Sequence, residues 1–141
     1  MTPVEVVREF ISRICRSDID GACDLVTDDV EYDNVPMGKV FGPQGIKDLL
    51  VPMLSGNGAD MADWVIHREA ATEGIVMNER TDRFKVQDRW VELPVCGVFE
   101  VTSTGKIRLW RDYFDLPTVT AAFGGTPDLD TDSRPRPVTP P

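Results

Sequence analysis

The stretch Asn78-Glu79-Arg80-Thr81-Asp82-Arg83-Phe84 places polar groups on one face of a predicted strand. Residues two apart in a strand share a face, so Asn78, Arg80 and Asp82 are expected to point the same way. That face therefore carries an amide, a guanidinium and a carboxylate, with an apolar residue at each end. A mixed face of this kind is either solvated or lines a pocket.

The segment after this stretch favours the pocket. Residues 90–101 are rich in β-forming side chains and carry little charge, which predicts a central strand beside the one with Arg80 and Asp82. A buried Arg–Asp pair is costly unless it is fully hydrogen-bonded. We therefore interpret Arg80 and Asp82 as part of a candidate active site.

Turn signals around these two segments predict a series of β-hairpins. Thr72-Glu73-Gly74, Gln87-Asp88 and Ser103-Thr104-Gly105 each separate two β-rich runs, so the strands they join should be antiparallel. Besides the strand that holds Arg80 and Asp82, we expect strands at 63–71, 90–102 and 106–115. A shorter strand is expected earlier, at 30–35.

Helical patterns dominate the first third of the chain. Thr2-Pro3 with Glu5 is a helix start, and apolar residues then recur at helical spacing as far as Ile14. Further helices are expected at 20–26, from Gly42-Pro43 to about Leu54, and at 118–123. Helices followed by a meander of strands predict an α+β fold, in which a curved sheet folds over the helices and encloses a pocket.

The composition is that of an ordinary globular protein of 141 residues, with 41% hydrophobic and 28% charged residues. We predict one domain over residues 1–125 and a flexible tail rich in Pro and Asp over 126–141. The net charge of −9 argues against nucleic acid or an anionic membrane as a partner. Neither a signal peptide nor a membrane span is apparent, so we expect a cytoplasmic protein.

The three cysteines do not form a recognisable framework. Cys15, Cys23 and Cys96 are widely spaced and odd in number, which fits reduced thiols better than disulfides or a zinc site. We expect Cys96 to be a small buried side chain on the central strand.

Two further segments bring polar groups onto predicted strands. Tyr32 and Asn34 are two residues apart and share a face, and Asp112 has the large aromatics Trp110 and Phe114 as its face partners. If these segments face one cavity with Arg80 and Asp82, the site holds two acids, an arginine, a phenol and an amide. That set suits acid–base chemistry with water, where one acid accepts a proton and the other donates one.

The runs Tyr32-Asp33-Asn34-Val35-Pro36, Glu79-Arg80-Thr81-Asp82 and Trp110-Arg111-Asp112-Tyr113-Phe114-Asp115 resemble the limonene-1,2-epoxide hydrolase family. The resemblance covers residues 3–123. It implies the cystatin-like α+β cone shared with nuclear transport factor 2, with N-terminal helices packed in a strongly curved, mixed but mostly antiparallel sheet around a deep pocket. It also implies a homodimer that hydrolyses a small apolar epoxide without a metal or a cofactor.

The same resemblance implies a role for each polar residue. Asp112 resembles the base that activates water, and Asp82 the acid that protonates the epoxide oxygen. Arg80 resembles the bridge between the two acids, whereas Tyr32 and Asn34 resemble the pair that holds the water with Asp112. The implied reaction is a one-step attack by water without a covalent enzyme intermediate.

Simpler interpretations stay open for several of these residues. Arg80 and Asp82 could form an exposed ion pair of little consequence, Tyr32 could be a core residue and Asn34 a turn residue. His67 is interpreted as a structural or surface residue rather than a catalyst. The alternative functions are an isomerase or polyketide cyclase on the same fold, and a domain that binds a ligand without catalysis.

Overall fold

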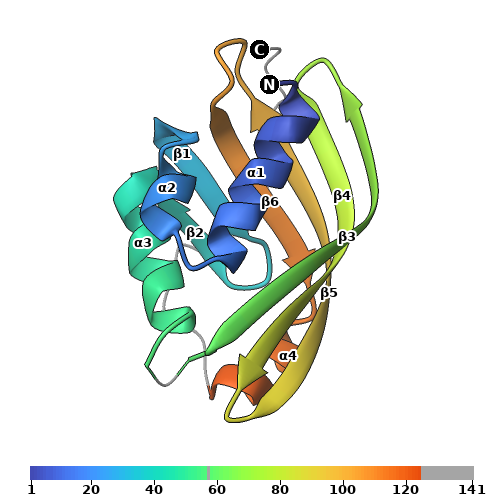
Figure 1. Cartoon of the computed structure of the whole chain (residues 1–141). Helices are drawn as coiled ribbons and strands as arrows, with labels where there is room; N and C mark the ends of the chain where they lie inside the picture. Colours follow the sequence, from blue (N-terminus) through green and yellow to red (C-terminus); the bar gives the residue numbers. More distant parts are fainter. Residues whose placement is uncertain (57, 125–141) are drawn as a thin grey trace.

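The computed structural model describes residues 1–56 and 58–124. Within them the chain forms four helices and six strands in an α+β arrangement (Figure 1). In chain order these are α1 (Pro3–Cys15), α2 (Ile19–Cys23), β1 (Val26–Asn34), β2 (Gly38–Phe41), α3 (Gly42–Met53), β3 (Met61–Thr72), β4 (Ile75–Val86), β5 (Arg89–Val101), β6 (Ile107–Phe114) and α4 (Leu116–Phe123).

The strands form one mixed sheet in the order β2-β1-β6-β5-β4-β3. The predicted meander is confirmed, because β3 to β6 are consecutive antiparallel neighbours. The β4–β5 hairpin turns at Gln87 and Asp88, both with positive φ, as a two-residue turn matched to the strand twist requires. β1 is the exception, since it runs parallel to β6.

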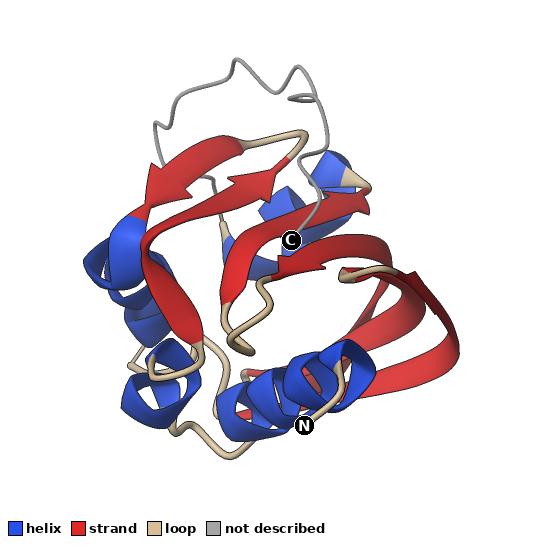
Figure 2. Ribbon diagram, turned by 90° about the horizontal axis from the view of Figure 1, so that it is seen from above, coloured by secondary structure: helices blue, strands red, loops and turns tan. Residues whose placement is uncertain are grey.

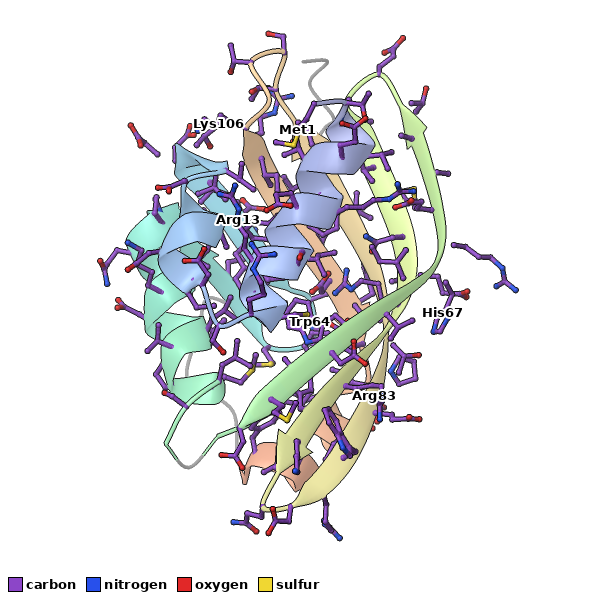
Figure 3. The ribbon with its side chains drawn as sticks, viewed as in Figure 1. Met1, Arg13, Trp64, His67, Arg83 and Lys106 are labelled. Atoms are coloured by element: carbon purple, nitrogen blue, oxygen red, sulfur yellow. The ribbon has the colours of Figure 1, made fainter. Side chains whose placement is uncertain are left out.

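The sheet is curved, and α1 lies against its concave side (Figure 2). Thr2 caps α1 by accepting a hydrogen bond from the amide of Glu5 at 3.2 Å, as the sequence predicts. The apolar side of α1 packs against the inner face of the sheet, with Phe10 and Ile14 fully buried. In Figure 3, Trp64 of β3 points into this interior, whereas His67 projects away from the sheet.

The start of the sheet differs from the prediction in two places. The second helix ends at Cys23 rather than at residue 26, because Val26 begins β1 and pairs with Ile107 of β6. The strand β2 was not predicted. It has only four residues and gains its partner from the preceding strand, where Gly38 lies opposite Asn34.

The alternation of β5 corrects the expectation for Cys96. Gly97 and Val95 face the interior, so Cys96 between them points outward and is exposed. His67 is exposed and its Nε2 lies 2.8 Å from Thr81 Oγ1, in agreement with a surface role.

The predicted tail at 126–141 lies outside the described residues, and the domain boundary at 125 stays a prediction. No helix among the residues described is both long and apolar enough to cross a membrane.

Candidate active site

The guanidinium of Arg80 is the centre of a buried polar cluster on the inner face of the sheet. Its Nε and Nη2 donate to the two carboxylate oxygens of Asp82, each at 2.9 Å. Its Nη2 also donates to Oδ2 of Asp112 at 3.0 Å. The Arg80 side chain is 0% exposed and each carboxylate is 4% exposed, so one cation joins two acids away from solvent.

Arg80 donates its fourth hydrogen bond to a residue that was not among the predicted site residues. Nη1 donates to Oδ1 of Asn78 at 2.9 Å. Asn78, Arg80 and Asp82 alternate along β4, so a single strand supplies the arginine and two of its three acceptors. The signal was in the sequence, since Asn78 shares the predicted inward face.

Gly97 makes room for this cluster. It lies on β5 between Asn78 of β4 and Asp112 of β6 in the sheet register. A Cβ atom at Gly97 would stand 2.4 Å from Nη1 of Arg80 and 2.9 Å from Oδ1 of both neighbours. The absence of a side chain at this position is therefore what allows the guanidinium to lie over the middle strand.

The parallel pairing of β1 with β6 brings the remaining predicted residues to the same place. Asn34 lies opposite Asp112 and Tyr32 lies opposite Trp110. The rings of Tyr32 and Trp110 stack with centroids 3.7 Å apart. All five predicted side chains are buried, and they come from β1, β6 and β4, with β5 between the last two strands.

Burial and charge adjust the proton affinities in this region. Burial raises the pKa of Asp82 to about 6, even though the charge and hydrogen bonds of Arg80 lower it. Burial also lowers the pKa of Arg80, but the charges of Asp112 and Asp82 raise it above its usual value. Burial and the Asp112 charge raise the pKa of Tyr32, so its hydroxyl stays protonated and can donate.

A cavity opens beside the cluster. Tyr32, Asn34, Asp82 and Asp112 form its polar end, and its volume is about 50 Å³. A water molecule needs about 10–15 Å³ of such space, so the cavity holds only a few waters, and the deep pocket of the prediction is not seen. The rest of the wall is apolar: Met37, Leu49, Met53, Trp64, Phe84, Leu93, Val95, Phe114, Val119 and Phe123.

The polar cluster contacts the apolar wall of the cavity at Trp64. The Arg80 guanidinium lies over the ring of Trp64, 5.5 Å from its centroid. Asp112 accepts the hydrogen bond from Arg80 with Oδ2, while its buried Oδ1 accepts no hydrogen bond from the residues that the structure describes.

Across residues 1–56 and 58–124, no group of His, Cys, Asp or Glu side chains is arranged to hold a metal ion.

The substitution Gly97→Ala tests how tightly the cluster is packed. We expect the added methyl group to displace the guanidinium and to lower the free energy of unfolding by about 1–3 kcal/mol, as overpacking of a buried site does. Urea denaturation measures the change, with Cys96→Ala on the exposed side of the same strand as the control. A Gly97→Ala protein as stable as the Cys96→Ala protein would contradict the packing described here.

Known proteins resemble this chain in sequence and in fold. The sequence model of the limonene-1,2-epoxide hydrolase catalytic domain matches residues 1–124. The epoxide hydrolase EphG of Mycobacterium tuberculosis is 36% identical over 110 residues, which cover 78% of this chain and 71% of that protein.

Solved structures show the same fold. A limonene-epoxide-hydrolase-like epoxide hydrolase from M. tuberculosis superposes with a TM-score of 0.73 at 33% identity, covering 86% of this chain and 88% of that one. A putative SnoaL-like polyketide cyclase from Shewanella denitrificans reaches 0.76 at 13% identity, over 86% of this chain and 96% of its own, and so shares the fold alone. Because the sequence model of the family's catalytic domain matches residues 1–124, this chain belongs to the limonene-1,2-epoxide hydrolase family.

Proposed function

We propose that this protein is an epoxide hydrolase that adds water to a small apolar epoxide and releases a vicinal diol. The observation that carries the proposal is the buried guanidinium of Arg80, which hydrogen-bonds the carboxylates of Asp82 and Asp112 at the polar end of an apolar cavity. The relative named as an epoxide hydrolase supports the same reaction class.

In the proposed mechanism, Asp112 accepts a proton from water. Its free Oδ1 is the acceptor, and Asn34 and Tyr32 on the neighbouring strand hold the water beside it. The water oxygen bonds to one ring carbon as the bond between that carbon and the epoxide oxygen breaks. Because water itself is the nucleophile, no covalent bond to the enzyme forms.

Asp82 acts as the acid in the same step. A carboxyl with a pKa of about 6 is protonated more often than an ordinary aspartate, so it can donate its proton to the departing epoxide oxygen. Arg80 contacts both carboxyls and holds them in fixed positions with its planar fork. After turnover Asp112 carries the proton and Asp82 is ionised, and exchange with solvent restores the starting state.

The cavity wall suits an apolar substrate. Binding sites for small molecules usually have volumes of about 300–1,000 Å³, so a cyclic epoxide would have to displace some of the lining side chains. Met37 and Met53 are the flexible members of the wall, since the unbranched side chain of Met adapts to different shapes. Phe123 of α4 packs against Phe84 at 5.5 Å between ring centroids and closes the same wall.

An isomerase or cyclase is the second function that this fold and site inventory allow. Such an enzyme would use Asp112 as a base on a carbon atom and a protonated acid to stabilise an enolate. The relative named as an epoxide hydrolase, which is 36% identical over 110 residues, favours hydrolysis over this alternative. The predicted homodimer and cytoplasmic location stay predictions.

Replacing either acid tests the assignment. We expect Asp82→Asn and Asp112→Asn each to lower kcat by about 10²–10⁴-fold, the usual contribution of a positioned acid or base, with the fold retained. Hydrolysis of a panel of cyclic and terminal epoxides provides the measurement. Asp63→Asn is the matched control, because Asp63 is an exposed acid on β3 whose partner is Arg83; it should keep full activity.

A single turnover of the wild-type protein with an epoxide in oxygen-18 water tests the nucleophile. Label in the diol supports direct attack by water, whereas unlabelled diol from the first turnover would indicate a covalent enzyme ester. No hydrolysis of any epoxide, or full activity in either Asn variant, would overturn the proposal.

The pH dependence follows from the pKa of Asp82. The acid must be protonated to donate, and its pKa is about 6, so its competent fraction falls as the pH rises above that value. We expect kcat/KM, which reports the free enzyme, to decrease by about tenfold per pH unit on the alkaline side. A profile that stays flat from pH 6 to pH 9 would contradict the role of Asp82 as the acid.

A further inference from the structure

A second buried ion cluster lies on the outer face of the sheet, behind the candidate active site. Nε of Arg111 donates to Oδ2 of Asp33 at 3.0 Å, and Nη2 donates to Oε2 of Glu31 at 3.1 Å. The three side chains are 6%, 0% and 3% exposed, respectively. The mechanism above uses none of them, although burying three charges is costly unless their geometry is well satisfied.

The cluster joins two strands that are distant in the sequence. Glu31 and Asp33 lie on β1 and Arg111 lies on β6, about eighty positions further along the chain. A hairpin turn fixes the register of β4 with β5, but no turn connects the parallel strands β1 and β6. Their register has to be set by side chains, and a slip of one residue would turn each inward residue of β1 outward.

The cluster alternates with the proposed water site along both strands. Tyr32 lies between Glu31 and Asp33, Asn34 follows Asp33, and Asp112 follows Arg111. Since successive residues of a strand face opposite sides, the register that joins Arg111 to both acids is the one that places Asn34 opposite Asp112. The planar guanidinium of Arg111 binds two acids on one strand. Two such contacts fix the position of β1 along β6 more tightly than one contact would.

We propose that Arg111 is a positioning residue that, through Glu31 and Asp33, holds β1 in register with β6 and thereby places Asn34 and Tyr32 beside Asp112. Its consequence for catalysis rests on the proposed function, whereas its effect on the strand pairing does not. The contact that reports the register directly is the backbone hydrogen bond from the amide of Val35 to the carbonyl oxygen of Asp112, at 3.0 Å.

The test compares Arg111→Lys with Arg108→Lys in the full-length protein. Lysine keeps the charge but lacks the planar fork. Arg108 is a matched control, because it is also on β6 and pairs with the buried Glu100 at 3.3 Å, but that pair joins β6 to β5, its partner in a hairpin. If Arg111→Lys does not fold, Glu31→Gln removes one arm of the cluster and is measured in its place.

The first readout needs no substrate. We expect the Val35 amide to exchange with deuterium at least about tenfold faster in Arg111→Lys than in the wild type, as loss of a charged hydrogen bond would allow, and Arg108→Lys to match the wild type. Unchanged exchange at Val35 in Arg111→Lys, or equal acceleration in both variants, would overturn the proposal.

The second readout is kinetic. We expect Arg111→Lys to lower kcat by about tenfold with little change in KM and in the pH profile, because the water is misplaced while the acid pair stays intact. In an Asn34→Ala background the same substitution should have little further effect, since both changes act on one water site. Additive losses would overturn the proposal. A wild-type protein that hydrolyses no epoxide would refute the proposed function, and the exchange result would still decide the role of Arg111.

Discussion

The hydrogen bonds of the buried Arg80 guanidinium hold together the polar cluster on the inner face of this sheet. It satisfies two carboxylates and an amide at once, and removing one partner of such a buried cluster costs about 3–5 kcal/mol because the remaining charges lose their compensation. Three adjacent strands contribute to this arrangement. β4 supplies the arginine, β6 supplies the second acid, and Gly97 of β5 leaves the space between them open. The same contacts that stabilise the sheet therefore hold two acids at fixed positions on a cavity wall.

Local patterns were sufficient to predict most of the elements around this cluster. Period-two alternation in β4 identified the inward face of Arg80 and Asp82, and short turns such as Gln87-Asp88 identified the hairpins, because both signals reside in neighbouring residues. The proposed site required one further step, that three separate segments face one cavity. That step came from the resemblance of their motifs to a known family, and the structure places all five side chains together.

What the sequence did not reveal depends on contacts between distant residues. Val26 begins β1 rather than ending a helix, because it pairs with Ile107 of β6, which is distant in the sequence. The role of Gly97 required the sheet register, and the Arg111 cluster required the parallel pairing of β1 with β6. The size of the cavity is a property of side-chain packing that no local pattern encodes. These long-range features are also the ones that determine how the proposed water site is assembled.

Arg80 joins two carboxyls in this site, and the pKa of one of them, Asp82, is raised by burial. Carbon-13 NMR of the aspartate side-chain carboxyls, with Asp82 assigned by its disappearance in Asp82→Asn, tests this claim without any substrate. We expect Asp82 to titrate with a midpoint near its pKa of about 6 and to be still protonated at pH 5. A carboxyl that is already ionised at pH 5, with a midpoint at or below the usual value of about 3.9 for aspartate, would contradict it.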